Sequence, residues 1–335
     1  MHRHQKYSLL EKIVNSINED GWDVFYLSDP KYHPFRLKIY NEKESYNIRI
    51  YIWHLTHGGG SARPVDEYRI QITGVDHFEA EVGGKTLILG WWEEGNVFAG
   101  FDFNKHIGNL GFSPSIQIRE AALRKAYVNG FSPWTKENQE TAIAFRTDFF
   151  VEYVRNLESL HSFGESKNDF EALENIANRP NEINDTIIES ISPPRQLTVT
   201  SVTKKISDNG FKARVLNAYS QKCAFCGLQL KLVDAAHILP VSYSESTDET
   251  CNGISMCALH HRAFDRSLVT INMEYQIVHN DKKIEKLSAE KLTDGVEDFV
   301  RYLRPYIILP PAVNDRPHIE YIKKTNEIRG WELNF

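Results

Sequence analysis

All four cysteines of this 335-residue chain fall within one short stretch, and their spacing suggests metal binding. Cys223 and Cys226 form a Cys-x-x-Cys pair, and about thirty residues later Cys257 and His260 form a Cys-x-x-His pair. Thiolates and imidazole nitrogens at these spacings are the usual ligands of a four-coordinate zinc ion. The four residues therefore predict a structural zinc site whose binding energy would stabilise a small, loop-rich unit. Cys251 is left outside this set.

A second set of polar residues is interleaved with the first. His237 lies in the apolar segment 232–240, which predicts a strand, and Asn252 is followed by Gly253 and another apolar run. His261 follows the zinc-type His260 on a predicted short helix. A base, an orienting amide and a metal-binding imidazole can meet if strand, loop and helix fold into one ββα unit. Histidine suits both tasks, because its pKa is near neutral and its neutral ring offers a lone pair.

Residues 205–280 resemble the HNH nuclease superfamily with its ββα-metal fold, in the branch with A-H-I-x-P in the strand and H-x-x-F-D in the helix. The resemblance implies that His237 is the general base for a water attacking a phosphodiester. It implies that Asn252 holds the loop and orients His237, and that His261 binds the catalytic ion, Mg²⁺ or Mn²⁺. It assigns the structural zinc to Cys223, Cys226, Cys257 and His260.

The chain departs from this family pattern at Ala236, where many members have an Asp or His that binds the metal. Asp234 is one candidate replacement, because a strand's period of two places it on the same face as Ala236. Asp265 is the other, because it lies four residues after His261 and so on the same helix face. A helix-end cap or an ion pair with a neighbouring arginine is an equally good interpretation of Asp265.

The N-terminal half has a different texture from the segment that carries this site. Residues 23–103 contain short segments rich in β-branched and aromatic residues between turn residues, which predict a mostly antiparallel, barrel-like sheet of five or six strands. An apolar stripe predicts a helix over residues 7–20, and further helices are predicted over 119–130 and 136–160. The fold class is therefore α+β.

The predicted domain organisation has three parts. Residues 1–160 form a β-rich DNA-recognition domain with flanking helices, and residues 161–200, rich in Pro, Asn and Ser, form a linker with one short helix near 168–177. Residues 201–335 form the zinc-stabilised HNH domain, which opens with a helix at about 208–220 and ends in a tail that packs back on its core.

The segment 54–63 of the N-terminal domain has features of a DNA-contacting loop. His54, His57 and Arg63 flank three consecutive glycines, so basic side chains surround a flexible loop. Aromatic residues nearby either stack on a base or, more commonly for strands, belong to the core: Trp91, Trp92, Phe101 and Phe103. The architecture resembles bacterial restriction endonucleases, including modification-dependent ones with reader domains, at the level of the fold only.

Composition limits the other possibilities. The net charge of −6 argues against indiscriminate nucleic-acid binding, and no apolar run is long enough for a membrane span. The first residues lack the continuous apolar core of a secretory signal, so we expect a cytoplasmic protein.

These observations favour a metal-dependent endonuclease for double-stranded DNA in a restriction or phage-defence system. We expect a homodimer, because one ββα site cuts one strand. The alternatives are a defence effector nuclease switched on by a signal or partner, and a zinc-stabilised DNA-binding protein whose HNH fold has lost cleavage.

Overall fold

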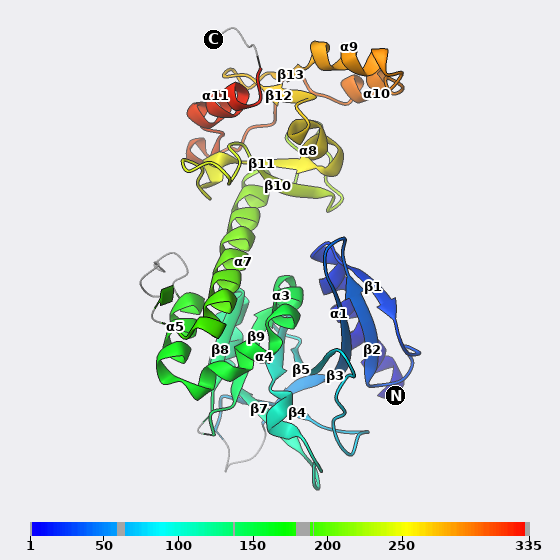
Figure 1. Ribbon diagram of the computed structural model, residues 1–335, viewed down its shortest axis with the longest axis vertical. Coiled ribbons are helices and arrows are strands. Elements are labelled where there is room, and N and C mark those ends of the chain that lie inside the picture. The colour runs from blue at the N-terminus through cyan, green and yellow to red at the C-terminus, as the bar shows by residue number, and fades with distance from the viewer. Residues whose placement is uncertain (1, 59–63, 137, 179–187, 190, 332–335) are drawn as a thin grey trace. The chain divides into compact units, whose positions relative to one another are not determined.

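The computed structural model describes residues 2–58, 64–136, 138–178, 188–189 and 191–331 (Figure 1). The chain forms two compact units, Met1–Ile206 (unit 1) and Ser207–Phe335 (unit 2). The boundary falls inside the helix α7 (Pro193–Ala218), which therefore contributes residues to both units.

Unit 1 is built on one nine-stranded sheet with the path β1-β2-β3-β5-β6-β9-β8 and a branch from β3 through β4 to β7. Its first six strands lie in the six segments where the sequence predicts strands. All pairs are antiparallel except β3 with β5, which is parallel. The strands are β1 (Asp23–Tyr26), β2 (Phe35–Tyr40), β3 (Ser45–His57), β4 (Glu67–Gln71), β5 (Lys85–Trp92), β6 (Val97–Phe101), β7 (Ser115–Arg119), β8 (Phe131–Thr135) and β9 (Thr141–Arg146).

The sheet is open, so the barrel-like prediction is wrong. Its edges are β1, β7 and β8, and among the described strands none of these edges pairs with another. The branch arises because the middle of β3 pairs with β5 while its last residues, Leu55 to His57, pair with β4. Residues 23–103 contain six strands, in agreement with the prediction of five or six, and three further strands after residue 103 extend the sheet.

The helix predicted over residues 136–160 is wrong in its first half, where the chain forms the central strand β9. Residues 141–145 are buried on both faces, since Ile143 and Phe145 pack in one core of unit 1 while Ala142 and Ala144 pack in the other. A continuous apolar run has no strand alternation, so its period did not distinguish it from a buried helix. Helical structure begins only at α3 (Phe150–Arg155) and continues in α4 (Leu157–Ser162).

Helices cover the sheet of unit 1 on both faces. α1 (His2–Glu19) packs against β1 and β3 through Leu9, Leu10, Ile13 and Ile17, as its apolar stripe predicts (Figure 1). α2 (Glu120–Asn129) ends at Gly130, whose φ of 91° gives the left-handed cap expected there. Three short 3₁₀ turns complete the unit: η1 (Phe103–His106), η2 (Thr147–Phe149) and η3 (Phe163–Glu165).

The region between 161 and 200 contains more helix than the sequence predicts. α5 (Lys167–Asn178) lies where the short helix is expected, and its Leu173 and Ile176 are buried in the core of unit 1. α7 starts at Pro193, well before the predicted start near 208. Proline is tolerated in the first turn of a helix, because the N–H that it lacks would have no partner there.

Unit 2 contains the expected ββα arrangement, in which β10 (Val233–His237) pairs antiparallel with β11 (Gly253–Cys257) and α8 (Ala258–Asp265) packs on both. Ile307 and Ile322 of the C-terminal tail are buried in the unit's core, as predicted. The remaining elements are η5 (Thr250–Asn252), β12 (Val269–Ile271), β13 (Ile277–His279), α9 (Asp281–Ala289), α10 (Val296–Arg301), η6 (Val313–Asp315) and α11 (Ile319–Ile328).

Membrane insertion has no support in these elements. Within the described ranges, every helix is too short or too polar to cross a bilayer.

Candidate active site and metal centre

The turn before β10 presents the first two cysteines. The N–H of Cys223 donates to the Leu228 carbonyl at 2.8 Å, and the N–H of Gly227 donates back to the Cys223 carbonyl at 2.8 Å. Gly227 has a φ of 84°, which a residue with a side chain rarely adopts. A further bond from Ala224 N–H to the Ser255 carbonyl, 2.7 Å long, fixes this turn on β11.

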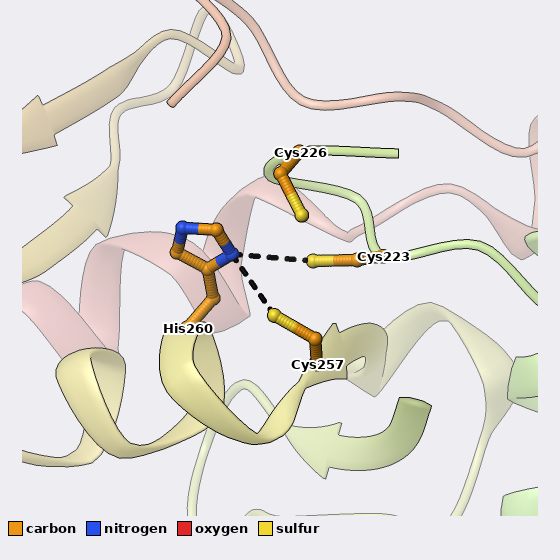
Figure 2. Close-up of side chains that lie close together, drawn as sticks. All are labelled: Cys223, Cys226, Cys257 and His260. Carbon is orange, nitrogen blue, oxygen red and sulfur yellow. Dashed lines mark hydrogen bonds between the residues drawn. The ribbon is translucent and has the colours of Figure 1, made fainter. Parts of the chain in front are cut away.

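The predicted zinc ligands come together. The donor atoms of Cys223, Cys226, Cys257 and His260 all lie within 4.8 Å of one another. Nδ1 of His260 is 3.5 Å from the sulfur of Cys223 and 3.2 Å from that of Cys257. Figure 2 shows all three sulfurs directed toward this nitrogen. A tetrahedral zinc ion separates such donors by roughly 3.5 to 4 Å, so the cluster fits this ion.

The short distances within the cluster also shift the pKa values of two of these thiols. The hydrogen bond with Cys257 lowers the pKa of Cys223 to about 3, although burial opposes the shift, and the same bond raises the pKa of Cys257. Cys251 lies apart from the cluster, with its sulfur 3.7 Å from a carboxylate oxygen of Glu249.

His237 ends β10 opposite Gly253, and two side chains fix its ring. Nε2 is 3.0 Å from Oδ1 of Asp248, and the ring stacks on Phe211 with centroids 3.8 Å apart and planes at 8°. A carboxylate can only accept, so Nε2 carries the hydrogen and a neutral ring keeps its lone pair on Nδ1. His237 is therefore arranged to accept a proton at Nδ1.

Asp248 is held in turn by two residues of α7. Its carboxylate accepts from the Ser207 hydroxyl, and Arg214 donates to its backbone carbonyl at 2.7 Å. Burial opposes ionisation, but the hydrogen bonds from Ser207 and His237 and the nearby positive charges lower the pKa of Asp248 below its usual value. The sequence reasoning missed this residue, and it missed the contact between Phe211 and His237.

Asn252 is fully buried and ties the loop after β10 to the start of β11. Its Oδ1 accepts from the Leu239 N–H at 2.9 Å, and its Nδ2 donates to the Thr247 carbonyl at 2.8 Å and to the Ser246 hydroxyl at 3.1 Å. The residue after Thr247 is Asp248, so this amide also fixes the loop that delivers the carboxylate to His237.

The two candidates for the missing acidic ligand lie in different surroundings. Ala236 is buried in the core, whereas Asp234 is exposed and forms an ion pair with Lys212 at 2.7 Å. Asp265 lies 3.5 Å from Nε2 of His261, with both side chains on the partly exposed face of α8. Asp265 also pairs with Arg329 of the C-terminal tail at 3.6 Å, rather than with an arginine of its own helix.

Two of the three predicted DNA-contacting residues of unit 1, His54 and His57, have partners within the unit. His54 lies 3.9 Å from Glu93, and His57 contacts the Val65 carbonyl and packs edge-on against Tyr68. Arg63 lies outside the described residues. Most of the nearby aromatic residues belong to the core and are not available for stacking on a base, since Trp91, Trp92 and Phe101 are buried.

Comparison with known proteins finds a family match in each unit. Residues 46–154 match the family described as methylase-associated X1, and residues 223–272 match the family described as HNH endonuclease. No curated protein matches the chain. One similar solved structure is the modification-dependent TagI restriction endonuclease, with a TM-score of 0.28 and 10% identity over 84% of this chain and 80% of that one. A segment of unit 2 is therefore similar to HNH endonucleases, and a segment of unit 1 is similar to methylase-associated X1 domains.

Proposed function

We propose that this protein is a metal-dependent endonuclease that hydrolyses phosphodiester bonds of double-stranded DNA. The observation that carries the proposal is the arrangement of His237, at the end of the ββα hairpin, with Nε2 bound to Asp248 and with no hydrogen-bond partner for Nδ1 among the described residues. A histidine held in this way is suited to general-base catalysis at neutral pH.

His237 and the residues around it each have a separate role in the proposed reaction. Nδ1 of His237 takes a proton from the water that attacks the phosphorus, and Asp248 stabilises the positive charge that the ring gains. Phe211 keeps the ring in one plane, and Asn252 keeps the loop that carries Asp248 in place. Each of these groups is therefore positioned before substrate binds.

His261 and Asp265 are the residues we assign to the catalytic ion, Mg²⁺ or Mn²⁺. Their facing atoms, 3.5 Å apart, can share one cation, and such hard ions retain water and take substrate oxygens as their other ligands. The ion, when bound, supplies positive charge to the phosphate and the leaving oxygen. Asp265 thus takes the role that a residue at position 236 has in other HNH proteins, because it faces His261, whereas the partner of Asp234 is Lys212. Zinc at the Cys₃His cluster has a structural role.

Unit 1 would select the DNA that unit 2 cuts. A methylase-associated domain joined to a nuclease fits a cytoplasmic restriction system, in which host DNA differs from foreign DNA by its modification. Modification dependence and a role in phage defence are extensions of this proposal.

Cleavage of supercoiled plasmid by the full-length protein with Mg²⁺ or Mn²⁺ tests the proposal. We expect His237→Ala to lower the cleavage rate at least about a hundredfold, because removal of a general base typically costs that much. His279→Ala is the matched control, since His279 is an exposed histidine of unit 2 that contacts Asp281. Cleavage that persists in His237→Ala would contradict the mechanism.

Two further outcomes would favour the alternatives. An intact plasmid with the wild-type protein and both ions would support a DNA-binding protein that has lost cleavage. Equal cutting of modified and unmodified phage DNA, only after a nucleotide or protein is added, would support a signal-activated effector.

A further inference from the structure

One face of the sheet in unit 1 is exposed at strands β1 and β2, and it carries aromatic and basic side chains. Along β2 the residues alternate, so that Leu37 and Ile39 are buried while Lys38 and Tyr40 are exposed. The edge strand β1 places Phe25 directly opposite Lys38. Phe25 is 61% exposed and Tyr40 is 38% exposed, which is unusual for aromatic residues on strands.

These side chains line a groove of about 600 Å³. Its walls are formed by Phe25, Leu27, Lys38 and Tyr40, together with the β2–β3 turn, residues 41–45. A second hollow, of about 360 Å³, shares Lys38 and Ser45 with the groove and extends to Gly83 and Gly84.

The unpaired charges of the groove are mainly positive. Among the described residues, no hydrogen bond or ion pair engages the ammonium groups of Lys38 and Lys43. The other charged groups around it are neutralised, as in the ion pairs of Glu44 with Arg155 at 3.0 Å and of Lys85 with Glu158. Only the carboxylate of Glu42 offsets the two free lysines.

We propose that this groove binds single-stranded nucleic acid, with an unstacked base against Phe25 and Tyr40 and phosphates at Lys38 and Lys43. Exposed rings beside free cations are the elements of a base-stacking platform, in which any base can lie on the ring and lysines follow the backbone. A protein partner fits less well, because free lysines interrupt the small apolar area. The inference rests on the proposed function, since it names the place where unit 1 contacts the DNA.

The experiment measures binding of fluorescent oligonucleotides to the full-length protein without added divalent metal. Each oligonucleotide carries 2-aminopurine, whose emission falls when the base stacks on an aromatic ring. We expect a single strand to bind more tightly than the matching duplex. The double variant Phe25→Ala/Tyr40→Ala should weaken single-strand binding about tenfold and abolish the emission change. Lys38→Glu should weaken binding and flatten its dependence on salt, because one phosphate contact is lost.

Phe112→Ala is the matched control, because Phe112 is a fully exposed aromatic residue of unit 1 outside the groove. Unchanged single-strand binding in the double variant would overturn the inference. The same is true if the double variant changes the molecular mass in light scattering while binding is unaffected, which would mark a protein interface.

The experiments distinguish failure of the groove proposal from failure of the nuclease proposal. Plasmid cleavage with unaltered oligonucleotide binding in the double variant refutes only the groove, whereas lost binding in that variant with no cleavage by the wild type refutes only the nuclease.

Discussion

One carboxylate, that of Asp248, determines which ring nitrogen of His237 carries the hydrogen. We expect Asp248→Asn to lower kcat roughly 10- to 100-fold, since the amide can still accept from Nε2 but no longer stabilises the positive ring with a charge. KM and zinc content should not change, because in the proposed mechanism Asp248 contacts His237 but neither the DNA nor the zinc ligands. The measurement is steady-state cleavage of a labelled duplex.

Glu249→Gln is the control for this substitution, as it removes a charge from the exposed neighbouring residue. A wild-type kcat in Asp248→Asn would show that His237 does not need the carboxylate. An equal loss in both variants would point to a general effect of charge in the loop.

The spacing of residues in the sequence explains why the zinc ligands could be predicted and why Asp248 could not. The zinc ligands follow fixed local intervals, and their prediction as a metal cluster agrees with the structure. Asp248 lies in a polar, acidic stretch, residues 245–249, with no interval that relates it to His237. Phe211 is buried, but its stacking on His237 depends on how α7 meets β10, which no local pattern encodes.

At the scale of elements, the zinc cluster joins the turn before β10 to the start of α8. We expect Cys226→Ser to lose the bound zinc and to lower the unfolding temperature of unit 2, because metal binding and folding are coupled in such sites. The unfolding of unit 1 should not change. Metal analysis and calorimetry together measure both effects.

Cys251→Ser supplies the comparison, since Cys251 is the cysteine outside the cluster. It should keep both the zinc and the melting profile of the wild type. Zinc retained in Cys226→Ser, or lost in Cys251→Ser, would contradict the ligand assignment.

A buried carboxylate near the β8–β9 turn predicts an acid-sensitive element in unit 1. Glu140 lies 2.9 Å from Nε2 of His106 and 2.7 Å from the ammonium of Lys136. Burial opposes ionisation, but these two partners lower the pKa of Glu140 to about 2. Because the folded-state pKa is depressed, the stabilisation is complete above the ordinary pKa of a glutamate and is lost as the pH falls from there through about 2.

We therefore expect Glu140→Gln to reduce the free energy of unfolding of unit 1 by about 2 to 3 kcal/mol at pH 7, with a smaller difference at pH 3. Denaturant unfolding at the two pH values measures this. Glu174→Gln is the control, because Glu174 forms an exposed pair with Lys125 and should change stability by less than about 1 kcal/mol. A pH-independent difference would show that packing, rather than ionisation, is responsible.

Element prediction succeeded where a segment has one buried face and failed where it has two. β2 and α1 show a clear period in the sequence and lie where predicted. β9 is buried on both faces, so its residues carry no period, and this burial depends on the helices that pack on the two faces of the sheet. The early start of α7 has another cause: Pro193 and Pro194 normally interrupt helices, but they are accommodated in a first turn.

At the scale of the whole molecule, one chain has one HNH site for two DNA strands. A single site cuts one strand in each encounter, so a double-strand break requires either two protomers or two successive events. We propose that two copies act together. The initial rate of linear product should then rise about as the square of protein concentration below the dimer dissociation constant, while nicked circles accumulate at low concentration.

Supercoiled plasmid with a single cleavage site, followed over time at several protein concentrations, separates these routes. Light scattering of the free and DNA-bound protein supplies the mass. Adding the His237→Ala protein to a limiting amount of wild type sharpens the test. Mixed dimers hold one working site, so the yield of nicked circles should rise while that of linear product falls. Linear product that forms in direct proportion to protein concentration, unaffected by the inactive partner, would mean that a monomer cuts both strands in turn.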